Sequence, residues 1–323
     1  MMKPGLLLTT LMLCFSICFA CPASGQTIQQ TKSNQRIGTM EDFDKTILKN
    51  PKDTAAYFYR ACLKANEDDL QGAIEDLNQA ISISPRYVEA LNFRGQLKAD
   101  LGDNEGAILD YNRVIELFPN LSTAYANRAF LKEESGDKEG ALEDYNKAIE
   151  LDSTDLINYH NRAILKAKCD DLQGAIEDFN RVIAIDPSST KAYFNRGTFK
   201  SYAGDYEGAI EDFNKAIELD PENSKCYSNR ALLKDYSGDK NGAMEDYNKA
   251  IKLDPNNFTA YRNRCMLRHE TGDLKGALED ISQAISLQPK DAESYLIRSQ
   301  IRENTGDHEG AKQDLDKAHE LDQ

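Results

Sequence analysis

Hydrophobic and polar residues alternate with a helical period in two short stretches, and this pair of stretches recurs every 34 residues from Thr54 onward. When each copy is numbered from 1 to 34, the recurring positions 4, 8 and 11, and then 20, 24, 27 and 28, lie mostly three or four residues apart. This spacing predicts one amphipathic helix per stretch, and therefore one helical hairpin per copy. Because a single hairpin cannot bury its apolar face alone, stacking on neighbouring copies must stabilise it.

Eight copies follow one another without gaps, and each contains residues that end and begin helices. Gly at position 15 ends the first helix in six copies, and Asp at position 16 is expected to cap the second helix in all eight. Seven of the nine prolines fall on the 34-residue grid, where they stop a second helix. The predicted repeats, numbered 1 to 8, are 54–87, 88–121, 122–155, 156–189, 190–223, 224–257, 258–291 and 292–323. Residues 39–51 resemble a second helix and predict a half-repeat helix that covers repeat 1.

Two of the copies show the repeated pattern most completely. Repeat 3 reads STAYANRAFLKEESGDKEGALEDYNKAIELDSTD, and repeat 5 reads TKAYFNRGTFKSYAGDYEGAIEDFNKAIELDPEN. Both have aromatic residues at positions 4 and 24, small residues at 8 and 27, and Ala at 20. These copies resemble the tetratricopeptide repeat (TPR) family, which has the same period. The resemblance implies an all-α fold, an α-solenoid in which helix-turn-helix repeats form a right-handed superhelix whose first helices line a concave groove.

Composition and charge narrow the function. The chain has 323 residues, 39 of them basic and 54 acidic, so its formal net charge is −15. This charge repels phosphate backbones, and we therefore expect no nucleic-acid partner. The four His residues do not cluster with Cys or carboxylates at ligand spacing, and we find no nucleophile with a base and no phosphate-binding loop. The sequence thus predicts a protein that is not an enzyme, with no catalytic residue, metal or cofactor.

Residues 1–25 predict an export signal rather than part of the fold. Their apolar run of 16 residues is shorter than the roughly 20 residues of a membrane-spanning helix and has the size of a signal-peptide core. Cleavage after Gly25 or after Ala20, lipidation of Cys21 and an uncleaved anchor are the alternatives. Residues 26–38 are polar, lack periodicity and predict a linker. We therefore expect an exported protein that contacts a membrane only through such an anchor.

Charged residues also recur at fixed positions. Arg at position 7 and Asp at position 23 occur in all eight repeats, and an antiparallel hairpin places these positions opposite each other. Because a buried guanidinium needs a carboxylate partner, we expect structural ion pairs rather than an arginine ladder for anionic ligands. The pairs expected in the middle repeats are Arg128–Asp144, Arg162–Asp178 and Arg196–Asp212. Position 11 is Lys or Arg and position 19 is Gly throughout, and we infer that this glycine leaves space for the stem of the residue at 11.

A series of asparagines at position 6 gives the best functional signal. At 100° per residue, positions 2, 5, 9, 12 and 13 lie opposite the stripe formed by 4, 8 and 11, with position 6 at the edge of that face. The series consists of Asn127, Asn161, Asn195, Asn229 and Asn263. A carboxamide matches the N–H and C=O groups of an extended peptide, and the series resembles the asparagines in the TPR superhelix of O-linked N-acetylglucosamine transferase. The alternative is that Asn-Arg at positions 6 and 7 only stabilises neighbouring helices.

Charged side chains at positions 2 and 5 are further candidates for partner binding. They are Lys191, Lys225, His160 and Arg262. The two-carboxylate clamp of chaperone-binding TPR domains is not expected, because position 9 is never Asn. The Asn that recurs at position 25 in six repeats is expected on the outer surface.

Two functions follow from these patterns. The first is a non-enzymatic scaffold that binds an extended segment of a protein or peptide partner in the concave groove. The alternative is a structural component of a cell-envelope assembly, tethered through Cys21, which contacts its partners by its ends or its convex face.

Overall fold

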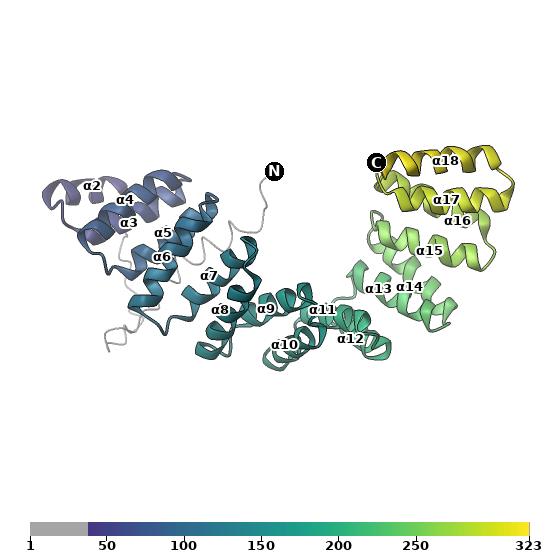
Figure 1. The fold of residues 1–323 in the computed structure, drawn as a ribbon, viewed down its shortest axis with the longest axis horizontal. Coiled ribbons are helices and arrows are strands. Elements are labelled where there is room, and N and C mark those ends of the chain that lie inside the picture. Colours follow the sequence, from purple (N-terminus) through teal and green to yellow (C-terminus); the bar gives the residue numbers. More distant parts are fainter. Residues whose placement is uncertain (1–37, 323) are drawn as a thin grey trace. The chain divides into compact units, whose positions relative to one another are not determined.

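The computed structural model describes residues 38–322, and all regular secondary structure in this range is helical (Figure 1). The helices are α2 (Met40–Lys49), α3 (Thr54–Asn66), α4 (Leu70–Ile83), α5 (Val88–Asp100), α6 (Asn104–Leu117), α7 (Ser122–Glu134), α8 (Lys138–Leu151), α9 (Leu156–Lys168), α10 (Leu172–Ile185), α11 (Thr190–Tyr202), α12 (Tyr206–Leu219), α13 (Ser224–Tyr236), α14 (Lys240–Leu253), α15 (Phe258–Glu270), α16 (Leu274–Leu287), α17 (Ala292–Thr305) and α18 (His308–Leu321). Helices α3 to α18 are the first and second helices of the eight repeats, which confirms the all-α hairpin prediction.

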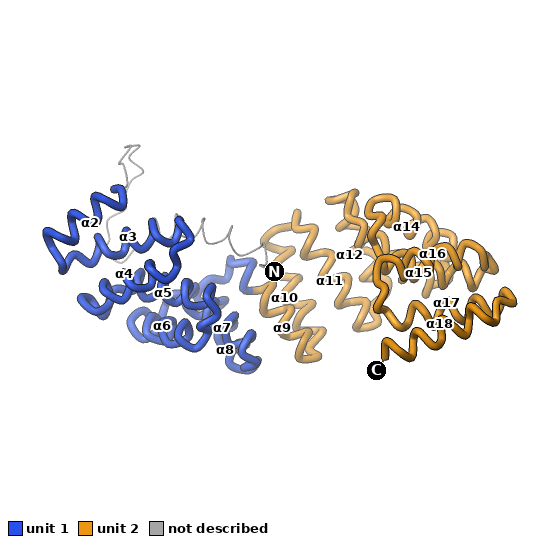
Figure 2. Tube along the Cα trace, turned by 90° about the horizontal axis from the view of Figure 1, so that it is seen from above, with its two compact units in different colours: residues 1–158 blue, residues 159–323 orange. Residues whose placement is uncertain are grey.

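The chain divides into two compact units, residues 1–158 and 159–323, shown in different colours in Figure 2. In the N-terminal unit, each helix from α2 to α8 packs on the next one in the chain. In the C-terminal unit, the same order of packing runs from α10 to α18. There, first helices of neighbouring repeats also touch, namely α11 with α13 and α13 with α15. Each unit is thus a stack of hairpins in chain order, as in an α-solenoid.

Each hairpin turn is fixed by the two residues predicted for it. The carboxylate of Asp205, for example, accepts a hydrogen bond from the backbone N–H of Gly208 at 3.0 Å and caps α12. Six glycines at position 15 adopt the left-handed conformation, with φ between 83° and 88°. In the other two repeats, Asp68 and Asp170 take the same conformation, with φ of 65° and 62°.

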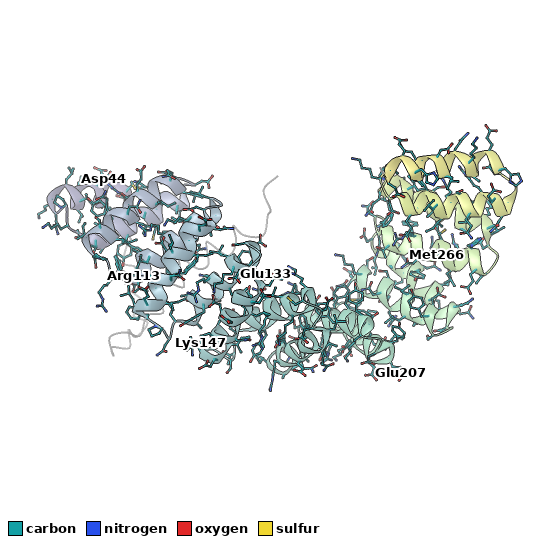
Figure 3. All side chains as sticks on the ribbon, viewed as in Figure 1. Asp44, Arg113, Glu133, Lys147, Glu207 and Met266 are labelled. Carbon is teal, nitrogen blue, oxygen red and sulfur yellow. The ribbon has the colours of Figure 1, made fainter. Side chains whose placement is uncertain are left out.

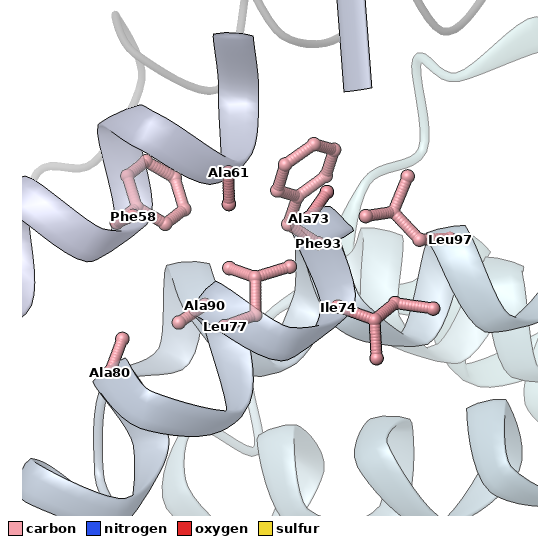
Figure 4. Packing of buried hydrophobic residues seen from close by; sticks show 9 residues of the cluster. All are labelled: Phe58, Ala61, Ala73, Ile74, Leu77, Ala80, Ala90, Phe93 and Leu97. Carbon is pink, nitrogen blue, oxygen red and sulfur yellow. The ribbon is translucent and has the colours of Figure 1, made fainter. Parts of the chain in front are cut away.

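The core is shared between successive hairpins. In the N-terminal unit, Phe58 of α3, Ile74 and Leu77 of α4, and Phe93 and Leu97 of α5 form one cluster (Figure 4). This cluster combines both helices of repeat 1 with the first helix of repeat 2. Burial of such side chains contributes about 25 cal/mol per Å² of apolar surface, and no single hairpin contains the whole cluster.

Several predictions fall outside these helices. The leader over 1–25, its Cys21 and nearly all of the linker over 26–38 lie outside the described residues. Within the described residues, no helix is both long and apolar enough to cross a membrane. In this part of the chain, Cys169, Cys226 and Cys265 have free thiols.

Candidate functional site

The arginine at position 7 is held inside its own repeat by a two-point hydrogen bond to the Asp at position 23. In repeat 6, Arg230 donates Nε to Oδ2 of Asp246 at 2.8 Å and Nη2 to Oδ1 at 2.6 Å. All eight repeats have these two bonds, and the eight Asp side chains are only 3–5% exposed. They include the expected pairs Arg128–Asp144, Arg162–Asp178 and Arg196–Asp212. These guanidinium donors are therefore used within the fold.

The basic residue at position 11 reaches the same Asp. In repeat 5, the Nζ of Lys200 lies 3.0 Å from Oδ2 of Asp212 and donates to the carbonyl oxygen of Gly208 at 3.3 Å. The reason we inferred for the glycine was wrong. A Cβ at Gly208 would lie 2.3 Å from Oδ2 of Asp205, the carboxylate that caps α12. The atoms nearest to this Cβ belong to the capping carboxylate and not to the stem of Lys200, so a side chain at position 19 would displace the cap.

A third contact of the arginine joins neighbouring repeats. The Nη1 of Arg230 donates at 2.7 Å to Oδ1 of Asn214, the position-25 residue of the preceding repeat. The same bond occurs in the pairs Arg94–Asn78, Arg128–Asn112, Arg196–Asn180 and Arg264–Asn248. Arg60 instead uses Asp44 of α2, which is labelled in Figure 3. Most of these asparagines are exposed, in line with the expected position on the outer surface. Their additional role is to link one repeat to the next. Sequence analysis missed this role, although positions 7 and 25 recur together.

The opposite side of each first helix is partly exposed, although Phe58, Asn92, Phe93 and Ser228 on it are buried. Side chains at positions 2, 5, 6, 9 and 13, which we call the first-helix face, fall within about 100° around the helix. Half of the exposed large apolar residues of the described chain lie there: Tyr59, Phe130, Ile157, Tyr202, Tyr236, Met266 and Leu296. Met266 is labelled on α15 in Figure 3. Position 8, on the other side, is buried in most repeats, as in Ala129, Ala163 and Ala231.

The asparagines of position 6 are half-buried at the edge of this face, and they are not equivalent. The amide of Asn127 lies beside the hydroxyl of Tyr111 in the preceding repeat and lowers its pKa, whereas burial raises that pKa strongly. Asn263 acts in the same way on Tyr247, although this hydroxyl makes no regular hydrogen bond.

Asn195 and Asn229 instead follow repeats with Phe179 and Phe213 at position 24, which have no hydroxyl. The structure therefore gives part of the series an intramolecular neighbour. It leaves the amides of Asn195 and Asn229 without a tyrosine hydroxyl at this position.

The charged candidates also differ among themselves. Arg262 is bound by its neighbours, because its Nη1 lies 2.6 Å from Oε2 of Glu293 and its guanidinium lies over the ring of Phe258. Lys191 and Lys225 are exposed, and neither forms an ion pair with a described carboxylate.

His160 packs edge-to-face against Phe179, with ring centroids 5.4 Å apart. Burial lowers the pKa of His160, and the positive charge of Lys191 lowers it further. Position 5 of repeat 4 and position 2 of repeat 5 are thus neighbours in the C-terminal unit.

The described residues show no arrangement suited to catalysis. They contain no group of three or more His, Cys, Asp or Glu side chains placed to hold a metal ion. Burial raises the pKa of Cys226 and Cys265 to about 12, so both thiols stay protonated at neutral pH and are poor nucleophiles. The features that distinguish one repeat from another are exposed side chains on the first-helix face. The fold defines a helical-repeat protein.

Comparison with known families and structures identifies which repeat class this is. Models of the tetratricopeptide repeat match residues 58–122, 122–155, 190–223, 236–264 and 292–323, more than half of the chain. The chain belongs to the tetratricopeptide repeat family. None of the curated proteins with which the sequence was compared matches it.

Solved TPR structures share the fold at low sequence identity. The C-terminal part of a TPR repeat-containing protein from Cytophaga hutchinsonii aligns with a TM-score of 0.63 and 18% identity, over 73% of this chain and 97% of that one. A tetratricopeptide repeat protein from Parabacteroides merdae aligns with a TM-score of 0.54 and 21% identity, over 81% and 99%. YrrB, described as a TPR protein with an unusual peptide-binding site, aligns with a TM-score of 0.51 and 20% identity, over 62% and 100%. These likenesses show the fold alone.

Proposed function

We propose that this protein is a non-enzymatic scaffold that binds an extended segment of another protein on the first-helix face of its C-terminal unit. One observation carries the proposal: the repeats share their buried network and differ in the exposed residues of this face. Contact between α11, α13 and α15 makes the face continuous over three repeats. The peptide-binding site described for YrrB supports binding by such a fold. Exposed apolar side chains with free amides between them suit a peptide, whose backbone also needs hydrogen-bond partners.

The test removes the two amides that have no tyrosine neighbour. Asn195→Ala combined with Asn229→Ala should reduce recovery of partner proteins in affinity capture from the exported fraction, while the melting temperature changes little. The matched control is Asn241→Ala with Asn256→Ala, two exposed amides that do not belong to a first helix. Equal recovery with the double variant, the control and the wild type would contradict the proposed role of the amides.

We also propose that the protein is exported. The apolar run and small residues near Ala20 and Gly25 support a cleaved leader. The sequence Phe19-Ala20-Cys21 supports the alternative function, an envelope component anchored by lipid at Cys21. Mass spectrometry of the mature N-terminus distinguishes a free terminus at Gln26 from a lipidated Cys21. An intact N-terminal Met in protein isolated from its native source would contradict both forms of export.

A further inference from the structure

Two rows of exposed side chains cross the first-helix face in repeats 5 and 6. Lys191 and Lys225 occupy the second residue of α11 and α13, and Tyr202 and Tyr236 occupy the last. Positions 2 and 13 point in directions only about 20° apart, and their separation of eleven residues places the rows about 16 Å apart along the helices. Because α11 and α13 touch, each row continues from one helix to the next.

The lysine row is a local positive site in a negatively charged protein. The net charge is −15, yet neither Lys191 nor Lys225 has a carboxylate partner among the described residues. The charge of Lys191 is felt by His160, whose pKa it lowers. The row does not continue into repeats 7 and 8, which have Thr259 and Glu293 at this position. Two ammonium groups without carboxylate partners favour a binding partner that carries negative charge beside Lys191 and Lys225.

The tyrosine row is an exposed aromatic surface. Tyr202 is 71% exposed and Tyr236 is 69% exposed, and Tyr206 at the start of α12 adds a third ring with 46%. The rings of Tyr206 and Tyr236 lie 6.3 Å apart. In repeat 7 the row ends at Glu270, which forms an ion pair with Lys240. Exposed aromatic rings that neighbour one another are typical of binding surfaces for apolar side chains.

The spacing of the two rows fits one backbone conformation of a partner. We take the step from one first helix to the next as that of packed helices, about 8–10 Å, which a polyproline II segment covers in three residues, with an advance of about 9.3 Å. In such a segment, one residue of each triplet lies beside the lysine row, first at Lys191 and three residues later at Lys225. A second residue of each triplet lies beside the tyrosine row, first at Tyr202 and then at Tyr236. Asn195 and Asn229 are half-buried and lie between the rows, at position 6 of α11 and α13.

We infer that the partner segment is extended and polyproline II-like, with acidic residues along one edge and apolar residues along the other. This inference rests on the proposed function, since it specifies the chemistry of the segment bound there. The acidic edge faces Lys191 and Lys225, and the apolar edge faces Tyr202, Tyr206 and Tyr236.

The test uses four labelled peptides and fluorescence anisotropy with the full chain. Their repeated triplets are Glu-Pro-Leu, Ser-Pro-Leu, Glu-Pro-Ser and Lys-Pro-Leu. We expect the first to bind most tightly and the last most weakly, and added salt to weaken only the acidic peptides. Lys191→Glu with Lys225→Glu should weaken binding of the Glu-Pro-Leu peptide about tenfold or more and improve binding of the Lys-Pro-Leu peptide. Tyr202→Ser with Tyr236→Ser should weaken both the Glu-Pro-Leu and Ser-Pro-Leu peptides.

The matched control is Lys215→Glu with Lys249→Glu, which makes the same change in net charge on α12 and α14. It should leave all four affinities within about twofold of the wild type, and circular dichroism verifies that every variant keeps its helices. Equal binding of the four peptides would overturn the inference and leave the proposed function in place. Binding of none of them would also overturn the inference, while the proposed function, which does not require a polyproline II segment, is tested by the asparagine variants.

Discussion

The buried junction inside each repeat and the exposed first-helix face use side chains in opposite ways. At the junction, the same Arg, Asp and basic residue meet in all eight repeats, and the bond from Arg Nε to the Asp is 2.8–2.9 Å long in each of them. On the face, no two repeats have the same set of residues at positions 2, 5, 9 and 13. The face has an unpaired Lys225 in repeat 6 and a neutralised Arg262 in repeat 7.

From this difference we expect stability to reside at the junction and selectivity for a partner to reside on the face. A charge buried at the junction must have its partner in every repeat, because an unpaired one would cost several kcal/mol. An exposed side chain on the face has no such requirement, and its identity can follow a partner. Substitutions at the junction should therefore change stability, and substitutions on the face should change binding.

Asp212→Ala is the strongest way to test this division. It leaves Arg196 and Lys200 without their shared carboxylate, and we expect a loss of about 3 kcal/mol in local stability. Repeat arrays do not always unfold in one step, so hydrogen exchange of amides in repeats 4–6 should accompany the melting curve. The control Glu211→Ala removes an exposed carboxylate from the same helix and should change stability by less than about 0.5 kcal/mol. Equal effects of the two substitutions would show that the buried pair does not stabilise the junction.

Gly242→Ala is the next largest test and concerns the hairpin turn. The new Cβ would lie 2.2 Å from Oδ2 of Asp239, so the cap of α14 must move, and we expect a loss of about 1–2 kcal/mol. In an Asp239→Ala background, the same substitution should be neutral or stabilising, because alanine favours the helix. Chemical denaturation of the four proteins gives the coupling between the two sites. Additive effects would show that the capping side chain does not explain the glycine.

Ser282→Asn tests the contact between repeats. Ser282 stands at position 25, where Asn in earlier repeats binds the next arginine, and among the described residues Arg298 has hydrogen bonds to Asp314 alone. The new amide should accept a hydrogen bond from Nη1 of Arg298 and stabilise repeats 7 and 8 by about 0.5–1 kcal/mol. Thermal unfolding measures the gain, with the exposed Ser286→Asn on the same helix as control. A gain of the same size in the control would point to helix composition instead.

The junction could be predicted from sequence because all of its parts lie in one repeat. Arg196 and Asp212 are sixteen residues apart on the two helices of a hairpin, and hairpin geometry alone brings them together. The cap of α12 by Asp205 follows from the adjacent turn in the same way. Our explanation of Gly208 failed because we considered the helix across the hairpin, whereas the residue that excludes a side chain is Asp205, three positions earlier.

Contacts between repeats were harder to predict, because they depend on how one hairpin sits on the next. The bond from Arg230 to Asn214 joins residues that periodicity alone does not pair. For the same reason, sequence analysis treated the asparagines of position 6 as equivalent. The residue beside each asparagine belongs to the preceding repeat, and it is Tyr111 for Asn127 but Phe179 for Asn195.

The smallest effect we predict lies on the face itself, at His160. Burial and the charge of Lys191 lower its pKa below the ordinary value of about 6.5, so the unfolded chain binds a proton more readily than the folded one. Stability therefore falls slightly as the pH decreases through about 6.5 toward the folded pKa, and it is fully present above that range. Lys191→Ala should raise the pKa of His160, as measured by NMR titration with His160→Gln for assignment. Lys225→Ala, which removes the same charge one repeat further on, should leave it unchanged. Because the charge contribution comes only from Lys191, equal shifts in both variants would mean that His160 senses the whole lysine row.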